Sequence, residues 1–356
     1  MSVINLLQKE MLSHQDLVQM LCVKNNDEQT LFEYSSKIKQ RHVGNKVYLR
    51  GLIEFSNICE KDCFYCGIRH SNQHAHRYCL TENEVVEAAI FAHQKGFGSL
   101  AIQSGELSSK AFTDRINSLL RKIMQATNNE LGITLSCGEQ SEDVYRQWFE
   151  SGSKRYLLRI ETSSEELYYK IHPNNSEHSY SERLRSLESL KKVGYHVGTG
   201  VMIGLPFQTK EILANDLLFM KQMDIDMCGM GPYIEHADTP LYQYKDKLLS
   251  LEERLDLSFK MVALLRVLMP DINIAATTAM QAIEKDGREK AIRVGANVLM
   301  PNITPRHYRD DYFLYQNKPV SQQSNEDDLK FQQERLRAVN HEIGYFQQGN
   351  SLHYKR

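Results

Sequence analysis

Eight short apolar runs recur along this chain, and nearly all of them are preceded or followed by an amphipathic helical pattern. Strands that alternate with helices form parallel sheets through right-handed crossovers. Eight such units close into a (β/α)8 TIM barrel, which is the α/β fold that we predict. An open doubly wound sheet is the alternative, but no G-x-G-x-x-G turn follows the first run. The runs occupy residues 46–55, 99–105, 132–138, 155–162, 196–204, 226–234, 272–280 and 296–304.

The helical patterns between the runs start with polar residues and carry apolar residues at helical spacing. Thr81 and Glu84, for example, predict a capping box at the start of a helix over residues 81–96. We predict an N-terminal helical extension (1–42), a barrel (43–320), and a C-terminal segment (321–356) with one closing helix and a loose end. Further helices are predicted at residues 13–24, 28–40, 141–152, 182–195, 209–224 and 250–270.

The charge balance excludes several classes of partner. Lys and Arg number 43 against 45 Asp and Glu, a net charge of -2, which gives no electrostatic reason to expect nucleic acid or an anionic membrane. The first residues lack the basic and apolar regions of a secretory signal. No apolar stretch approaches the ~20 residues that cross a bilayer. We therefore expect a cytoplasmic protein.

Three of the seven cysteines, Cys59, Cys63 and Cys66, lie close together with the spacing C-x3-C-x2-C, directly after the first strand. A cluster of this kind without a secretory signal indicates a metal site or catalysis. Zinc would need a fourth ligand, for which His70 is a candidate. An iron–sulfur cube held by only three thiolates would leave one iron open to a substrate or cofactor. The other four cysteines, at positions 22, 79, 137 and 228, are expected to be small buried side chains.

The spacing of these cysteines, with Tyr65 just before the third, resembles the signature of the radical S-adenosylmethionine (SAM) enzymes. The resemblance implies a 4Fe–4S cluster whose open iron is chelated by SAM. It further implies that one electron from the cluster cleaves SAM to methionine and a 5′-deoxyadenosyl radical. The segment "QSGE", which contains Ser104 and Gly105, resembles the family's Gly-Gly-Glu segment, whose role is to hold the methionine ammonium. A simple strand-to-loop turn is the other interpretation of that segment.

Charged residues of the fourth run share one parity. Arg155, Leu157, Arg159 and Glu161 therefore lie on one face of the strand, and we predict that this face points into the barrel, because helices cover the outside. Buried charges must be paired or bound to a ligand. We expect Glu161 to accept hydrogen bonds from a ribose or an ammonium group and Arg159 to face a carboxylate. Arg183 would supply a second positive charge for the cofactor carboxylate.

Five further residues are candidates for the cavity wall. Thr134 and Ser136 offer hydroxyl contacts at one parity of the third run, and Arg50 is a charge within the first. Met202 and Met230 lie at strand ends, where methionine can pack on an adenine ring. Ordinary core packing, or the β-propensity of threonine, is the competing explanation for the threonine and methionine positions.

Over residues 45–310 the chain resembles one branch of these enzymes, the FeFe-hydrogenase maturase HydE family within the biotin-synthase-like group. Matching runs include "LIEFSNIC", "CFYCGIR", "RYLLRIET" and "GPYIEHADTPL". The resemblance implies that the radical attacks the sulfur of a cysteine-bound iron dicarbonyl cyanide unit. It also implies a low-potential electron donor and other hydrogenase maturation proteins as partners. By carry-over, the anion-binding part of the cavity would be lined by Arg155, Gln103, Thr278 and Tyr308.

The chain departs from some relatives in two respects. No cysteine follows Cys228, so the auxiliary C-terminal cluster of part of the family cannot form, and Ile160 stands where relatives can carry histidine. Three alternatives remain: a methylornithine-synthase-like mutase acting on a small amino acid, an iron–sulfur carrier without radical chemistry, and a zinc hydrolase.

Overall fold

Eight parallel strands close into a barrel in the computed structural model, which describes residues 2–319 and 325–355. The strand order is β10-β9-β7-β5-β4-β3-β2-β1, and β1 pairs with β10 through Tyr48 and Val298, which closes the sheet. The predicted (β/α)8 barrel is confirmed. The strands are β1 (Lys46–Ser56), β2 (Ser99–Ser104), β3 (Gly132–Ser136), β4 (Ser153–Leu157), β5 (His196–Thr199), β7 (Met227–Cys228), β9 (Asn273–Ala276) and β10 (Val298–Leu299).

Two of the predicted runs are interrupted strands. The run at 196–204 forms β5 and then β6 (Met202–Ile203), and the run at 226–234 forms β7 and then β8 (Gly231–Pro232). The strands β6 and β8 pair with each other in a separate two-stranded sheet. These short strands extend the wall of the barrel beyond its main sheet.

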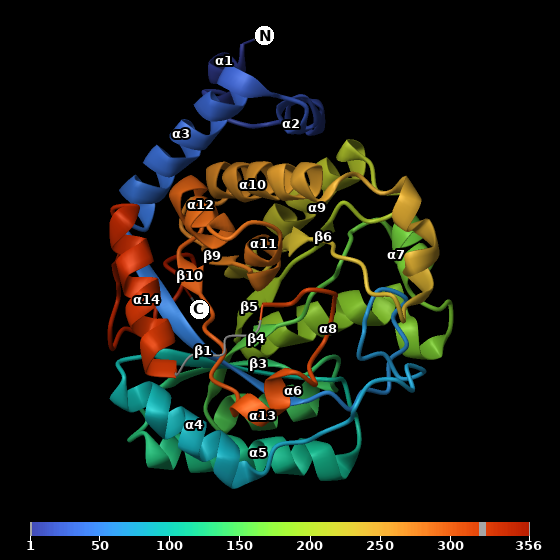
Figure 1. The fold of residues 1–356 in the computed structure, drawn as a ribbon, viewed down its shortest axis with the longest axis vertical. Coiled ribbons are helices and arrows are strands. Elements are labelled where there is room, and N and C mark those ends of the chain that lie inside the picture. The colour runs from blue at the N-terminus through green and yellow to red at the C-terminus, as the bar shows by residue number, and fades with distance from the viewer. Residues whose placement is uncertain (1, 320–324, 356) are drawn as a thin grey trace.

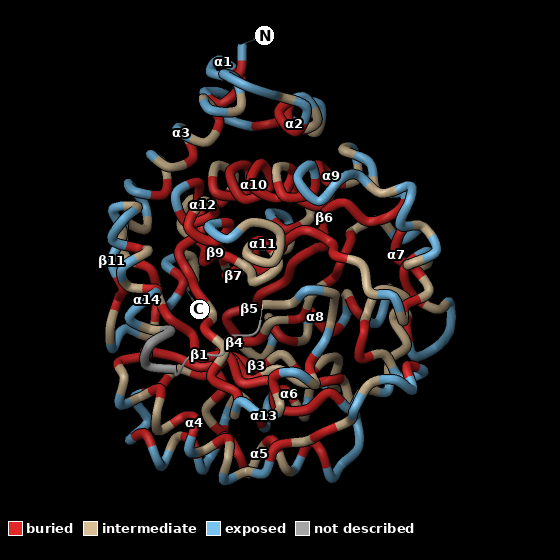
Figure 2. Tube along the Cα trace, viewed as in Figure 1, coloured by how far each residue is buried: buried red, intermediate tan, exposed pale blue. Residues whose placement is uncertain are grey.

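Helices form a ring around the strands (Figure 1). The predicted capping box is present, because the Thr81 side chain accepts from the Glu84 N–H and Glu84 accepts from the Thr81 N–H. Buried residues concentrate in the strands and on the helix faces that cover them (Figure 2). The main helices are α4 (Glu82–Gln94), α5 (Lys110–Ala126), α6 (Glu142–Glu150), α8 (Tyr180–Val193), α9 (Lys210–Gln222), α10 (Leu251–Leu268) and α12 (Gly287–Val294). Shorter ones are α7 (Glu165–Ile171), α11 (Thr278–Ile283) and α13 (Arg306–Arg309).

The side chains of β4 alternate between the helices and the barrel interior, as their parity predicts. Tyr156 points outward, where its ring stacks on Trp148 at 6.4 Å and meets Tyr145 at 5.0 Å. Leu157 lies on the opposite face and lines an internal cavity. The charges that share its parity are therefore enclosed by the barrel.

The N-terminal helices α1 (Val3–Leu7), α2 (His14–Leu21) and α3 (Asn25–His42) lie outside the ring (Figure 1). The helix α3 packs against α10, and α2 packs against α9. Helix α10 thus has the barrel on one side and α3 on another, which explains why most of its residues from Arg254 to Arg266 are buried. No helix in the described ranges is long and apolar enough to span a bilayer.

The C-terminal segment continues beyond its helix into a packed tail. After α14 (Asn325–Ala338), β11 (Glu342–Ile343) pairs in parallel with the start of β1. The following residues cover the amino-terminal end of the barrel, where Asn273 Nδ2 donates to Gly349 O at 2.9 Å and Tyr354 stacks on His196 at 3.5 Å. The prediction of a loose end was wrong, since these residues bond to strand residues. The predicted boundary at residues 320 and 321 lies outside the described residues.

Candidate active site

A cavity of about 360 Å³ extends from the loops at the carboxyl ends of the strands down to Arg50 and Asn273 inside the barrel. Its volume is that of a small-molecule site. Most of the residues selected from the sequence line it, although their roles stay predictions. Those residues are Arg50, Cys59, Cys63, Tyr65, Cys66, Gln103, Ser104, Gly105, Thr134, Ser136, Arg159, Glu161, Arg183, Met202 and Thr278.

The three clustered cysteines lie on one loop after β1, and all three border the cavity. The Glu106 N–H donates to Cys59 Sγ at 3.3 Å. Burial raises the pKa of the Cys66 thiol to about 12 and that of Cys63 well above its usual value. Free thiolates are therefore costly in this loop, and a cation that binds them must displace protons.

Glycine allows this loop to approach the second strand closely. A Cβ atom at Gly105 would lie 2.2 Å from Ile58 O, so a larger residue would push the cysteine loop away. The Gly105 N–H donates to Ser56 O at 2.7 Å. The segment that resembles Gly-Gly-Glu therefore supports the cysteine loop through its backbone.

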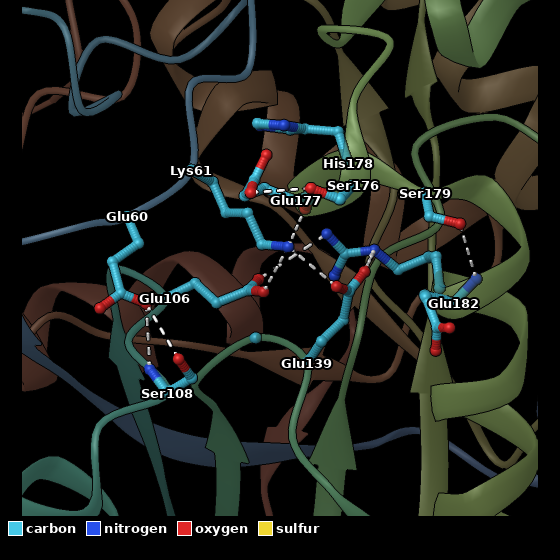
Figure 3. Close-up of polar contacts among 12 residues, drawn as sticks. Glu60, Lys61, Glu106, Ser108, Glu139, Ser176, Glu177, His178, Ser179 and Glu182 are labelled. Atoms are coloured by element: carbon cyan, nitrogen blue, oxygen red, sulfur yellow. Dashed lines mark hydrogen bonds and ion pairs between the residues drawn. The ribbon is translucent and has the colours of Figure 1, made fainter.

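Four charged side chains, each only 10–14% exposed, form a quartet beside the cysteines: Lys61, Glu106, Glu139 and Arg183 (Figure 3). Lys61 Nζ lies 3.1 Å from Glu106 Oε1 and 2.9 Å from Glu139 Oε2. Arg183 Nε lies 2.8 Å from Glu139 Oε1, and Arg183 Nη2 lies 3.7 Å from Glu106 Oε2. Two cations thus face two carboxylates, and the quartet joins the loops that follow β1, β2 and β3 to the start of α8.

The quartet keeps both of its cations charged. Burial alone would lower the pKa of Arg183, but Glu139 and Glu106 outweigh it and raise that pKa well above its usual value. Burial also opposes the charge of Lys61, and the same two carboxylates raise its pKa. Sequence reasoning missed Lys61, Glu106 and Glu139 as site residues. Their positions could have identified them: Lys61 lies within the cysteine motif, and Glu106 and Glu139 follow the second and third strands.

Gly138 makes room for this arrangement. Its φ of +75° is left-handed, and a Cβ atom there would lie 2.1 Å from Glu106 Cγ. The segment "TLSCGE" can therefore turn Glu139 toward Arg183 while Glu106 passes beside the glycine.

Arg159 and Glu161 form a second ion pair on the cavity wall, in which Arg159 Nη2 lies 2.9 Å from Glu161 Oε2. Glu161 has a φ of +65°, an uncommon conformation for a residue with a side chain. Its buried Oε2 atom is the one that faces Arg159, whereas the buried hydroxyls of Thr134 and Thr277 make no hydrogen bond to the described residues. Buried polar atoms that lack protein partners indicate a polar ligand. Thr277 was not selected from the sequence, although it belongs to the segment "ATTAM" that was.

A segment after β10 closes another side of the mouth. Lys318 Nζ bonds Glu54 and donates to Tyr312 O at 2.8 Å. The side chains of Lys318 and Glu54 are both nearly fully buried. Lys318, Glu54 and Tyr315 all line the cavity. Glu54 has the parity of Arg50 on β1 and could have been inferred from it. Lys318 carries no comparable pattern in the sequence.

Three of the selected residues lie elsewhere, which corrects their predicted placement in the cavity wall. Arg155 Nη2 donates to Gln348 O at 2.9 Å and also bonds Asn350, so this arginine contacts the C-terminal tail. Tyr308 stacks on Tyr78 at 4.9 Å, on α13. Met230 is fully buried in the hydrophobic core.

The donor groups fit an iron–sulfur cluster with SAM. The described residues hold no group of three His, Cys, Asp or Glu side chains arranged around a single metal ion. A cube instead takes each thiolate at a different iron, so its three ligands need not converge on one point. Cys228 also borders the cavity, but its thiol donates to Met220 Sδ. The partnerless hydroxyls of Thr134 and Thr277, together with the Arg159–Glu161 ion pair on the same cavity wall, suit the polar groups of a nucleoside or an amino acid.

Comparison with known proteins gives matches over most of the chain. A model of the radical SAM superfamily matches residues 53–220. The chain is 44% identical to the [FeFe] hydrogenase maturase subunit HydE of Thermotoga maritima, over 82% of this chain and 80% of the relative. It is 26% identical to the 3-methylornithine synthase of Methanosarcina acetivorans, over 81% and 79% of the two chains. The crystal structure of methylornithine synthase (PylB) superposes with a TM-score of 0.81 at 23% identity, covering 97% of this chain and 98% of that one.

Proposed function

Because this chain belongs to the HydE family of radical SAM enzymes, we propose that it acts in building the di-iron active site of an [FeFe] hydrogenase. The proposed substrate is a cysteine-bound iron dicarbonyl cyanide unit, whose sulfur is the site of attack. The identity of 44% over most of both chains supports this role. A low-potential electron donor and other hydrogenase maturation proteins would be its partners.

The residues at the mouth of the cavity would have different binding roles. Cys59, Cys63 and Cys66 would hold a 4Fe–4S cluster, and with SAM bound this group supplies a 5′-deoxyadenosyl radical by one-electron reduction. Arg183 would bind a carboxylate of the cofactor, because the quartet keeps it charged. Glu161 would accept hydrogen bonds from the cofactor with its carboxylate, which is held by Arg159 through Oε2. Each group is held by protein contacts before any ligand arrives, which lowers the cost of binding.

The observation that carries the proposal is the position of the cysteine loop. Its thiols, the Glu161 carboxylate and the partnerless hydroxyls of Thr134 and Thr277 border one cavity that also reaches into the barrel. Apolar side chains such as Leu157 and Met202 complete the walls and would shield a reactive radical from water. A cofactor at the mouth and a small substrate below it would then lie within reach of each other.

A product assay tests this proposal. Anaerobic protein with a reconstituted cluster is reduced with dithionite and given SAM and a synthetic cysteine-bound iron dicarbonyl cyanide complex. Attack at sulfur joins the 5′ carbon to that atom, so we expect methionine from SAM cleavage, rather than free 5′-deoxyadenosine, to accumulate in proportion to the iron complex consumed, as measured by chromatography and infrared spectroscopy. The Cys63→Ser variant should form none, whereas the matched Cys22→Ser variant, at an exposed cysteine outside the loop, should react normally. Wild-type turnover by Cys63→Ser would reject the cluster assignment.

A second candidate is a mutase acting on lysine, favoured by the 26% identity to 3-methylornithine synthase. A mutase returns the hydrogen atom to its product and regenerates SAM, so methionine would not accumulate. Conversion of lysine to methylornithine, with the iron complex left intact, would replace the first proposal. If reduced protein leaves SAM intact under all conditions, an iron–sulfur carrier is the better description.

A further inference from the structure

Arg77 lies near the end of the loop that carries the three cysteines, and its guanidinium binds the backbone of that loop. Nη1 donates to Asn57 O at 2.6 Å and to Ile68 O at 2.7 Å. Nη2 donates to Arg69 O at 2.6 Å, and to the carbonyls of residues 72 and 70 at 3.1 and 3.4 Å. One side chain thereby joins the backbone just before the cysteine motif to the backbone just after it.

Asn57 completes this closure. It is fully buried, its Oδ1 accepts from the Tyr78 N–H at 2.8 Å, and its Nδ2 donates to His76 O at 2.7 Å. Residues 57–78 thus form a loop whose two ends are tied together at Asn57 and Arg77. The cysteines lie within this loop, so their relative positions depend on how firmly it is closed.

The contacts of Arg77 lie close to the cysteines along the chain. The Ile68 carbonyl, two positions after Cys66, accepts from Arg77 Nη1 at 2.7 Å, and the Asn57 carbonyl, two positions before Cys59, accepts from the same atom at 2.6 Å. Arg77 therefore fixes the backbone on both sides of the cysteine motif. Outer contacts that orient the ligands of a metal site are among the factors that set how firmly the metal is held.

The charge of Arg77 also lies within the cysteine loop. All five of its acceptors are carbonyl oxygens, which leave its positive charge in place. Two of these carbonyls, at residues 57 and 68, are each two positions from a cysteine of the motif. A positive charge at this place stabilises thiolates and the electron that a cluster accepts.

We propose that Arg77 is a positioning residue for the iron–sulfur cluster. It closes the loop on which the three cysteines are mounted, and it places a positive charge within that loop. The proposal depends on the presence of the cluster and not on the identity of the substrate, so it stands or falls separately from the maturation role.

Two substitutions separate these contributions. Arg77→Lys keeps the charge, but a single ammonium cannot reach five carbonyls that surround a planar guanidinium. Arg77→Gln removes both the charge and most of the hydrogen bonds. Arg266→Lys is the matched control, because Arg266 also donates to backbone carbonyls, at Gly295, Pro270 and Ile272, and lies far from the cysteines in the sequence.

The experiment measures the cluster rather than turnover. Each reconstituted protein is assayed for iron and sulfide content, for the rate of iron loss to a chelator, and for cluster potential by an EPR-monitored redox titration. We expect iron retention to fall about 10-fold in both Arg77 variants, the loss typical of outer-shell partners of a metal site. The potential should become more negative in Arg77→Gln and stay near wild type in Arg77→Lys.

The control decides between positioning and general stability. Arg266→Lys should lower the melting temperature and leave iron retention and potential unchanged. Wild-type retention and potential in Arg77→Gln, or equal losses in Arg266→Lys, would overturn the proposal. If Arg77→Gln does not fold, the iron-loss rate of Arg77→Lys still tests the proposal. Unchanged iron retention in Arg77→Lys would contradict the role of the five hydrogen bonds that Arg77 donates to the loop carbonyls.

Discussion

The two ends of the barrel bury the same residue type and satisfy it in different ways. At the mouth, Arg183 and Lys61 face Glu106 and Glu139 in a quartet of charges. At the amino-terminal end, Arg50 and Arg155 donate to backbone or side-chain oxygens of the tail. Salt-bridged groups can exchange a partner for a charged ligand. Groups that hold a folded segment cannot do so without releasing it.

This difference also affects the charge state of the arginines. Burial lowers the pKa of Arg155 to about 10, and burial together with the neighbouring Arg155 lowers that of Arg50. At the mouth the carboxylates reverse the effect of burial on Arg183. The comparison therefore suggests that the mouth is arranged for ligand binding and that the opposite end is arranged for stability.

The largest effect that we expect is a loss of SAM affinity when the arginine at the mouth is replaced, but not when the one at the opposite end is. Arg183→Met would leave Glu106 and Glu139 with Lys61 alone and remove the proposed partner of the cofactor carboxylate. We expect SAM affinity to fall about 10- to 100-fold, the equivalent of ~1.5–3 kcal/mol for a charged hydrogen bond. Equilibrium binding of SAM to the reconstituted protein measures this change.

Arg155→Met is the matched variant for this comparison. It should leave SAM affinity unchanged and lower the free energy of unfolding by about 1–3 kcal/mol, because the oxygens of Gln348 and Asn350 lose their hydrogen bonds to the buried arginine. Equal losses of SAM affinity in the two variants would show that the ends of the barrel are not functionally distinct.

Removing the residues after Gln347 tests separately whether this tail supports stability and whether it affects SAM binding. A chain that ends at Gln347 loses the contacts of Gly349, His353 and Tyr354 with the strands and their loops. At about 1 kcal/mol for each hydrogen bond, the free energy of unfolding should fall by several kcal/mol, with SAM affinity retained. Urea denaturation measures the first and equilibrium binding the second. A chain that ends at Asn350 keeps the Gly349 contact and should be intermediate. Full stability in the shorter chain would mean that the tail does not support the barrel.

The smallest expected effect is a pH dependence at His353, whose ring nitrogens lie 2.7 Å from Asp224 Oδ1 and 2.9 Å from Asp271 Oδ1. Burial lowers the pKa of His353, but the two carboxylates outweigh it and raise the pKa above its ordinary value. Protonated His353 therefore stabilises the folded chain at pH values below about 6.5, and this contribution is lost as the pH rises through the folded-state pKa. The loss should be less than about 1 kcal/mol because the pair is partly exposed.

Urea denaturation of wild type and His353→Gln at several pH values between about 5.5 and 8.5 measures this contribution. The difference in stability between the two proteins should shrink as the pH rises. A difference that stays constant, or grows, would contradict the assignment of a charged His353.

Much of the site was predictable because its signals are local. The cysteine spacing, the inward parity of Arg159 and Glu161, and the polar residues after each strand all indicated a site at one end of a barrel. The same argument from parity wrongly placed Arg155 in the cavity wall. Alternation tells which face of a strand a residue occupies, but it does not tell how deep the residue lies along the barrel. Lys318 had no local signal, because its partner Glu54 lies on a strand far away in the sequence.

The sequence by itself determined the barrel, the cysteine loop and the side of each strand that carries charge, because hydrophobic periodicity and short spacings act within a few residues. Only the tertiary structure decided which arginine meets carboxylates and which meets the tail. Those pairings join segments distant along the chain, such as Arg155 with Asn350 and Lys61 with Glu139. Burial makes an unpaired charge costly wherever it lies, but the closed barrel alone fixes which oxygen is close enough to pair with it.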